Sequence, residues 1–347
     1  MKSYIYLSFL IIMSFLLGCA KEADRNSLEA QLEFVQTYPV VGDPVDFDVS
    51  DDYVFIAEDE MGFSIINRQS SELYYRTNKF GISSLTSIPL VRYNKDNNIL
   101  FVVDLSEGHR LLPVKLDSLQ NFNEDDTHTN VGSLYNARDL VFEDIPADST
   151  KFLIYSTNFK YLLNTNQLMI GVFSTTATSA VAQLNLTPYP VPNAIHRIQL
   201  TPNNLIIAMG QRGLRIYNKN DLIDFVDINT PGEARDMKIC DNYIYVADRQ
   251  QGLQIIDITD ISNPILLEAS ARATNGFATS IDISGQFLAL GSGSGGVYLY
   301  DISNPTTPIL IDNLNEDEIG YVYKVLFFKN ELYISSKSRG IVRYQVQ

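Results

Sequence analysis

Short runs of alternating apolar and polar residues, separated by turn residues, recur along most of the chain. One clear run is 243–247, and a glycine-bearing turn separates it from a second run at 253–258. Side chains of a strand alternate between its two faces, so a two-residue period predicts strands with one buried face. No part of the sequence carries a convincing long 3.6-residue period. We therefore expect an all-β protein with few helices.

The same unit of strands and turns occurs seven times. In the two best-preserved copies, three landmarks recur 44 residues apart: Gly252 as Gly296, Asp257 as Asp301 and Pro264 as Pro308. The other five copies keep the strand pattern, with second strands at 54–57, 100–103, 152–155, 205–208 and 332–335. Four short strands every forty-odd residues are typical of a propeller blade. The sequence therefore predicts a seven-bladed β-propeller of four-stranded blades over residues 31–347.

The two ends of this repeat region are complementary. The last copy stops at Gln347 after its third strand, whereas an additional strand at 31–36 precedes the first copy. We expect the additional strand to complete the last blade, because closing the ring removes exposed sheet edges. Its two-residue period places Leu32 and Phe34 on one buried face and Val35 on the other.

Residues 1–18 resemble a bacterial lipoprotein signal peptide. Lys2 precedes an uncharged run from Tyr4 to Leu17, and Leu16-Leu17-Gly18-Cys19 resembles the lipobox. The resemblance implies cleavage before Cys19 and acylation of its thiol with diacylglycerol and palmitate. The alternative is an uncleaved anchor with a chance cysteine. Residues 19–30 are polar and are expected to be a flexible, lipid-anchored tether.

The segment after Cys19 bears on the membrane. Its second residue is Ala20 rather than the Asp linked to inner-membrane retention, and residues 20–24 resemble surface-export tethers of Bacteroidota lipoproteins. We expect anchoring in the cell envelope at the outer membrane, facing the periplasm or the cell surface.

Two of the copies also resemble a known repeat family. The pattern at 252–257, repeated at 296–308 with Asp301, Asn304, Pro305 and Pro308, is similar to that of the LVIVD-repeat family of bacterial propellers. The resemblance is close in two copies and rests on periodicity in the other five. It implies an extracytoplasmic β-propeller and does not define an activity. The absence of tryptophan disfavours the WD type of repeat.

Composition excludes several classes of function. The formal net charge is −15, so no excess of basic residues exists to bind nucleic acid. The three histidines, His109, His128 and His196, have no neighbours at metal-ligand spacing. The glycine-rich segment 291–296 opens a strand and lacks the lysine of a phosphate-binding loop. We expect a monomer without a cofactor, a metal site or a catalytic constellation.

A polar residue followed by an apolar one begins the first strand of every copy. Because the innermost strands of a propeller line its channel, these residues are expected to ring one channel mouth. They either bind a ligand or bond neighbouring blades together, since buried polar groups need partners. The seven residues are Asp46, Ser87, Asp139, Arg197, Asp236, Ser280 and Lys324.

These observations favour a non-enzymatic propeller that binds a protein or glycan partner through its loops. The alternative is a lactonase-like hydrolase that holds a divalent metal with Asp46, Asp139 and Asp236. Arg197 and Lys324 at the same level of the channel argue against a metal site there.

Overall fold

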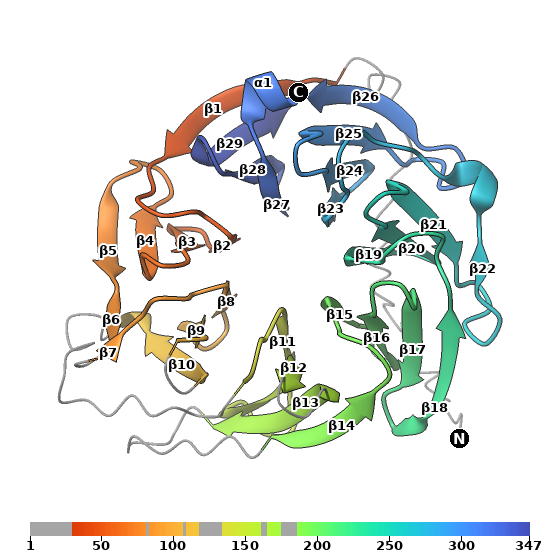
Figure 1. Cartoon of the computed structure of the whole chain (residues 1–347), viewed down its shortest axis with the longest axis horizontal. Helices are drawn as coiled ribbons and strands as arrows, with labels where there is room; N and C mark the ends of the chain where they lie inside the picture. The colour runs from red at the N-terminus through yellow and green to blue at the C-terminus, as the bar shows by residue number, and fades with distance from the viewer. Residues whose placement is uncertain (1–29, 81–82, 107–108, 118–133, 161–164, 175–185) are drawn as a thin grey trace, which may run out of the picture.

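Seven antiparallel β-sheets surround a central axis in the computed structural model of the protein (Figure 1). The structure describes residues 30–347 except 81–82, 107–108, 118–133, 161–164 and 175–185. In the first six sheets, the strand that comes first in the chain lies nearest the axis. The seven-bladed β-propeller expected from the repeats is confirmed.

Blades one to three follow one another along the chain. Blade one contains β2 (Asp46–Val49), β3 (Tyr53–Ala57), β4 (Phe63–Asn67) and β5 (Leu73–Thr77). A hairpin of β6 (Lys79–Phe80) and β7 (Ser83–Ser84) precedes blade two, whose described strands are β8 (Leu90–Asn94), β9 (Ile99–Asp104) and β10 (Arg110–Lys115). Blade three contains β11 (Leu140–Asp144), β12 (Lys151–Lys160), β13 (Thr165–Ser174) and β14 (Thr187–Val191).

Blades four to seven complete the ring. Blade four contains β15 (Arg197–Leu200), β16 (Asn204–Ala208), β17 (Leu214–Asn218) and β18 (Asp221–Ile228). Blade five contains β19 (Asp236–Cys240), β20 (Tyr243–Ala247), β21 (Leu253–Asp257) and β22 (Ile265–Leu266), followed by the 3-10 turn η4 (Glu268–Ser270). Blade six contains β23 (Ser280–Ser284), β24 (Phe287–Gly291), β25 (Val297–Asp301) and β26 (Ile309–Leu314), followed by α1 (Glu316–Ile319). Blade seven contains β27 (Val322–Phe328), β28 (Glu331–Ser336), β29 (Gly340–Val346) and β1 (Leu32–Tyr38).

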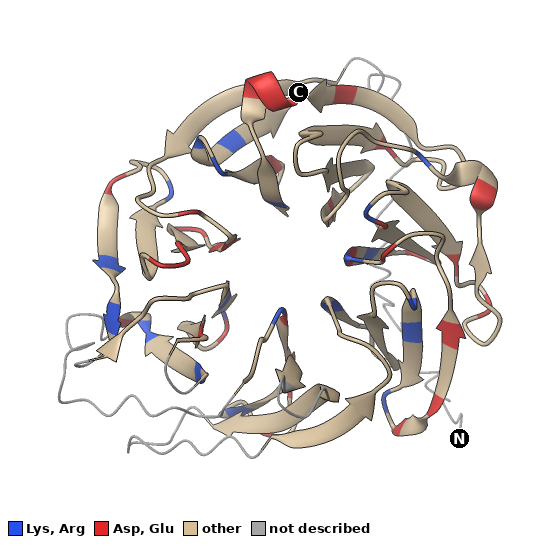
Figure 2. Ribbon diagram, in the orientation of Figure 1, with Lys and Arg blue, Asp and Glu red and all other residues tan. Residues whose placement is uncertain are grey.

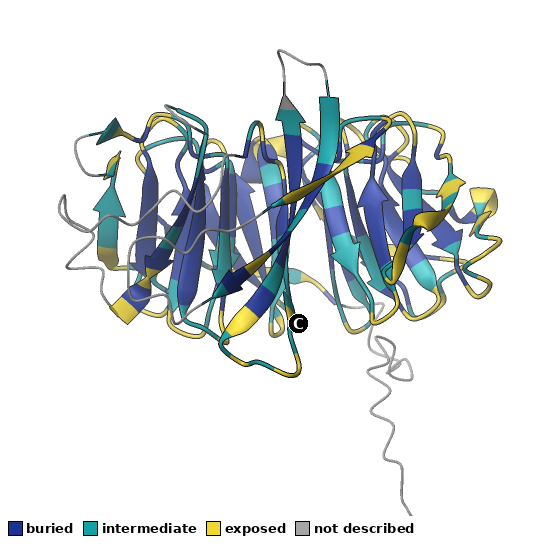
Figure 3. Cartoon of the chain, turned by 90° about the horizontal axis from the view of Figure 1, so that it is seen from below, coloured by how far each residue is buried: buried dark blue, intermediate teal, exposed yellow. Residues whose placement is uncertain are grey.

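The hydrophobic core is divided among the interfaces between blades. Each of the seven interfaces holds one cluster of buried apolar side chains, such as Phe55 of blade one with Leu100 of blade two. Buried residues fill the blades, whereas exposed residues gather in the turns and on the outer strands (Figure 3). Burial of apolar area drives folding, so each blade depends on both neighbours for its stability.

The turn glycines of blades five and six are required by the backbone. Gly252 and Gly296 have φ values of +69° and +79°, a region that glycine enters without strain. A Cβ atom on Gly296 would lie 1.9 Å from the carbonyl oxygen of Leu314. These positions therefore require glycine for two reasons, conformation and space.

The N-terminal strand closes the ring, as expected, by pairing with β29. Leu32 pairs with Val346, and Tyr38 pairs with Ile341. The expectation that Phe34 is buried is wrong, because its side chain is 57% exposed and contacts Tyr344 only edge-on. Phe34 lies on β1, the outermost strand of blade seven, where little of the protein covers it. Beyond Phe34, a bulge before Gln36 changes the face that the rest of the strand presents.

The bulge lets one strand contact both adjacent interfaces. Leu32 packs against the cluster between blades six and seven. Tyr38 is fully buried in the cluster between blades seven and one, and its hydroxyl donates to the Arg68 carbonyl. The closing strand is therefore held by side chains as well as by its main chain.

Candidate functional site

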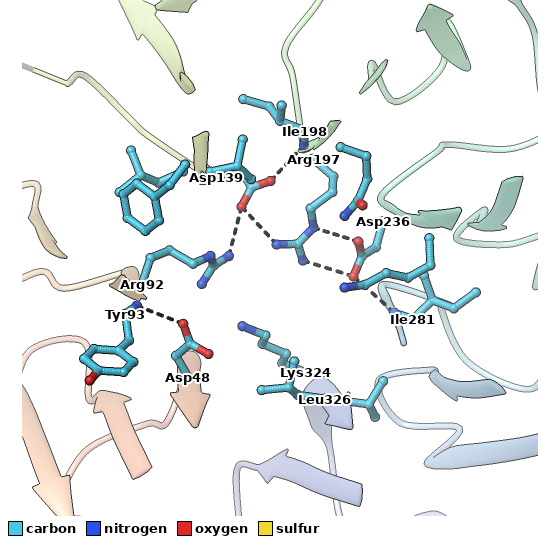
Figure 4. A pocket seen from close by; sticks show the side chains of 16 residues that line it. Asp48, Arg92, Tyr93, Asp139, Arg197, Ile198, Asp236, Ile281, Lys324 and Leu326 are labelled. Carbon is cyan, nitrogen blue, oxygen red and sulfur yellow. Dashed lines mark hydrogen bonds and ion pairs between the residues drawn. The ribbon is translucent and has the colours of Figure 1, made fainter. Parts of the chain in front are cut away.

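The polar residues at the inner ends of the blades surround the central channel. Figure 2 shows both basic and acidic residues at the ends of several blades nearest the axis. A pocket of about 270 Å³ lies there, and Figure 4 shows the side chains of Asp139, Arg197 and Asp236 converging on it. We call the charged and hydroxyl residues at this level the channel ring and define its members below.

Six of the seven residues expected at the channel mouth lie in this ring. Each is at or near the start of an innermost strand, and those of blades one, three, five and six are almost fully buried. The six are Asp46, Asp139, Arg197, Asp236, Ser280 and Lys324.

Ser87 does not lie in the ring. It precedes β8 and is only half-buried, and its carbonyl accepts from the backbone N–H of Leu105. Leu90 occupies the equivalent position, because it pairs with Val103 just as Asp46 pairs with Ala57. The polar residue expected in blade two is thus replaced by an apolar one, and the alignment of Ser87 differs from the structure by three residues.

Arg92, which lies two residues after Leu90 on β8, supplies the charge of blade two. Its guanidinium ion-pairs with Asp46 through Nη1 and lies 2.9 Å from Asp139 through Nη2. Sequence reasoning missed this residue because its long side chain reaches back to the ring. Its place on the same strand face as Leu90 was the available signal.

Ion pairs link the ring residues into a continuous chain. Lys324 Nζ lies 2.8 Å from Asp46 Oδ1, and Arg92 continues from Asp46 to Asp139. Arg197 then lies 3.2 Å from Asp139 and donates two hydrogen bonds, of 2.7 and 3.0 Å, to Asp236. The two donors of Arg197 hold Asp236 in the bidentate geometry that arginine favours with carboxylates.

The same acceptors also bind the backbone of the next blade. Asp139 accepts the backbone N–H of Ile198 at 2.8 Å, and Asp236 accepts that of Ile281 at 3.1 Å. The bonds from Val91 to Asp46 and from Val325 to the Ser280 hydroxyl are equivalent. With the ion pairs of Arg92, Arg197 and Lys324, polar contacts of the ring span all seven blade interfaces.

Three more charged residues form a second layer, two positions further along the innermost strands. Asp48 accepts the backbone N–H of Tyr93, and Asp282 accepts that of Phe327. Lys238 lies 3.1 Å from Asp282. Sequence analysis missed this layer, although the two-residue period from Asp46, Asp236 and Ser280 leads directly to it.

Charge pairing controls protonation inside the channel. Burial alone would raise the pKa of Asp46, but the positive charges of Arg92 and Lys324 outweigh it and lower that pKa. Burial is likewise outweighed at Asp139, where Arg197 and Arg92 lower the pKa. Both carboxylates are therefore held ionised, and their oxygens are already engaged as acceptors.

The ring pairs each carboxylate with a cation of the protein instead of leaving it open to a metal. Within the described part of the chain, no three His, Cys, Asp or Glu side chains gather as a metal site. Chemically, the ring can stabilise the blades and present a mixed polar floor to a small ligand.

The remaining residues singled out from the sequence have separate places. Cys240 ends β19 and is buried, and His109 adopts a left-handed conformation with φ of +49°. His196 immediately precedes Arg197 at the channel mouth. Cys19 and His128 lie outside the described residues, and no helix among those described is long and apolar enough to cross a membrane.

Comparison with known repeats identifies two blades. The LVIVD repeat model matches residues 231–270 and 275–316, which correspond to blades five and six. The chain carries LVIVD repeats. These LVIVD repeats are the two best-preserved copies of the unit, and their family is associated with β-propeller proteins.

Solved structures support the fold of the LVIVD-repeat chain. The WD40 repeats of RRP9 align with a TM-score of 0.69 at 11% identity, covering 92% of this chain and 100% of that one. The WD40 β-propeller domain of Doa1 aligns with a TM-score of 0.66 at 11% identity, covering 91% and 97%. The designed protein Ika8 gives 0.60 at 11% identity, covering 91% and 100%. At this identity the likeness shows the fold alone, and no curated protein matches the sequence.

Proposed function

We propose that this protein is a lipid-anchored lipoprotein of the cell envelope whose propeller binds a protein or glycan partner without catalysis. The β-propeller supports a binding or scaffold module, because loops on a rigid framework are where binding residues usually lie. The lipobox-like sequence at 16–19 supports the anchor, and the outer membrane, facing the periplasm or the surface, is the proposed location.

The observation that carries the proposal is the pairing of the channel charges. Asp46, Asp139 and Asp236 each contact a cation and a backbone N–H of the protein. Groups used in this way stabilise the framework, since unpairing a buried charge is costly. Recognition is then left to the loops of the two faces.

The hydrolase alternative requires the opposite behaviour from the same carboxylates. A divalent metal in the channel would have to displace Arg92 and Arg197 from Asp139. Calorimetric titration of CaCl2 and ZnCl2 into the purified chain tests this alternative. Stoichiometric, tight binding that Asp139→Asn abolishes would favour the hydrolase over the binding module.

Site-specific photo-crosslinking in cells tests the binding module directly. A photoreactive amino acid is placed at Tyr321, before β27, or at Asp51, after β2, because these exposed residues lie at opposite ends of the innermost strands. We expect one discrete crosslinked partner from one face and none from the other. Absence of a discrete product at either position, and at neighbouring exposed loop positions on both faces, would contradict the proposal.

A further inference from the structure

Three consecutive blades place a basic or imidazole side chain directly before the channel ring. Arg138 precedes Asp139 in blade three, His196 precedes Arg197 in blade four, and Arg235 precedes Asp236 in blade five. Because the innermost strands begin here, the three side chains lie at the mouth of the channel, outside the ring. We call them the mouth cluster.

The two arginines of the mouth cluster converge on one imidazole nitrogen. Arg138 Nη1 lies 2.7 Å from His196 Nδ1, and Arg235 Nη1 lies 3.4 Å from the same atom. Arg138 Nη1 also lies 3.2 Å from His196 Nε2. A guanidinium only donates hydrogen bonds, so the imidazole nitrogen that receives one must accept it with its lone pair. The imidazole is therefore neutral, and it brings two positive charges together without neutralising either.

Acidic partners do not balance these charges. Among the described residues, Arg138 has no carboxylate within ion-pair distance, and its side chain is buried only in part. Glu233 contacts Arg235, but it also contacts Arg249. Arg235 and Arg249 thus share one glutamate and Arg138 has none, on a protein whose formal net charge is −15.

The hydrogen-bonding capacity of the cluster is also incomplete. Arg235 Nε is buried and has no hydrogen-bond acceptor among the residues that the structure describes. Buried polar groups are nearly always paired, so this unpaired donor is a hydrogen-bonding capacity that the cluster could use when it binds an acceptor. An acceptor that carries negative charge would satisfy both the donors and the excess charge.

The proton affinities agree with this geometry. Burial and the charges of Arg138 and Arg235 lower the pKa of His196 to about 3, although Glu233 opposes the shift. Burial and the charge of Arg235 lower the pKa of Arg138. The positive charge of Arg138 is thus destabilised by its surroundings, and a bound anion would reverse that destabilisation.

We propose that Arg138, His196 and Arg235 form a binding site for an oxyanion, a carboxylate or a phosphate, at the mouth of the channel. Within the described part of the chain, Arg138 Nε and Nη2 donate to no acceptor, so its planar guanidinium can offer a bidentate contact, and Arg235 supplies a second charge. The inference deepens the proposed binding function, on which it rests, by naming the chemistry of a group that the partner presents.

Nuclear magnetic resonance of the imidazole groups tests the proposal on the full chain. The chain has three histidines, so the resonance of His196 is assigned by its loss in His196→Gln. Sodium phosphate and sodium acetate are titrated against sodium chloride at constant ionic strength. We expect a saturable shift of the His196 resonance and a rise of its pKa with phosphate or acetate, and neither with chloride.

Variants connect the response to the arginines. Arg138→Gln and Arg235→Gln should each weaken the apparent affinity at least tenfold. Arg215→Gln is the matched control, because Arg215 belongs to the same blade as His196 but already pairs with Asp227. If Arg138→Gln fails to fold, Arg138→Lys replaces it, and it should weaken binding because lysine lacks the planar fork.

A further arm distinguishes the source of the anion. Bicelles containing phosphatidylglycerol are compared with bicelles of phosphatidylcholine alone. A response to phosphate or acetate supports a soluble or partner-borne anion, and a response confined to phosphatidylglycerol assigns the site to a lipid headgroup. No shift with any probe overturns the oxyanion site, whereas loss of crosslinks from both faces overturns the binding module instead.

Discussion

Lys324 of the last blade and Asp46 of the first blade are joined by an ion pair of 2.8 Å. Lys324 also donates to the Phe47 carbonyl at 2.6 Å, so one ammonium group binds both side chain and backbone of blade one. The ring of polar contacts is therefore continuous across the same interface that β1 closes at the periphery.

Removing Asp236 should destabilise the fold rather than merely weaken ligand binding. Asp236→Ala removes the acceptor of two Arg197 hydrogen bonds and of the backbone N–H of Ile281, and leaves Arg197 with Asp139 alone. Breaking a buried pair costs about 3–5 kcal/mol of unfolding free energy. Asp227→Ala, which removes the exposed partner of Arg215, should cost at most about 1 kcal/mol. Urea unfolding of the two variants measures the difference, and equal losses would contradict a structural role for the ring.

Stability should fall in acid because of the ring carboxylates. The pKa values of Asp46 and Asp139 are lowered by folding, so their contribution is complete above the unfolded pKa of about 4. It is lost as pH falls below that value through the lowered folded pKa. We expect the melting temperature to decline steeply below about pH 4.

Substitution of Arg92 tests whether the ring carboxylates cause the loss of stability in acid. Arg92→Gln should destabilise the protein at pH 7 and flatten its decline in acid, because both carboxylates then lose a cationic partner. Lys151→Gln, which removes an exposed pair with Asp148, is the control and should leave the melting curves near those of the parent. Parallel acid profiles for Arg92→Gln and the parent would show that other groups control the transition.

Deleting residues 31–38 should open the ring. The deletion removes the partner of β29 and the buried side chain of Tyr38, and the exposed edge of β29 should promote association. Light scattering and thermal melts measure both effects. The control deletion removes 20–28, leaving Ala30 and the bonds between Gln31 and Gln347 intact. A monomeric 31–38 deletion that melts like the parent would show that β1 does not hold the ring.

Cys19 should carry the membrane anchor. Cys19→Ser should leave the chain uncleaved or shift it to the soluble fraction, since the thiol is the proposed acceptor of the lipid. Cys240→Ser is the control, because Cys240 is buried at the end of β19 and should not affect fractionation. Mass spectrometry of the parent follows the modification, and an unmodified mature N-terminus would contradict the lipoprotein assignment.

The periodic features of the fold could be predicted from the sequence. The contacts that depend on how far a long side chain extends could not. Gly252 and Gly296 marked their turns because only local conformation was involved. The position of Arg92 in the ring depends on a guanidinium that spans two neighbouring blades, which no repeat alignment contains. Phe34 was misplaced because β1 is the outermost strand of its blade, and the alternation of residues does not show how little of an outer strand is covered.

The mouth cluster was beyond sequence reasoning for a related reason. The three residues of the cluster lie far apart in the chain, and no sequence motif marks any of them. They are Arg138, His196 and Arg235. Only the curvature of the ring brings the three side chains to one point.

The pairing of β1 with β29 also sets the order of folding. Leu32 and Val346, which are joined in one ladder, are separated by more than three hundred residues. Contacts of such separation form slowly, because the entropy of closing the loop is lost before any contact compensates it. Single blades can form from local hairpins, but β1 stays unpaired until β29 has folded. Ring closure is then the final step of folding, and detachment of β1 is the natural first step of unfolding.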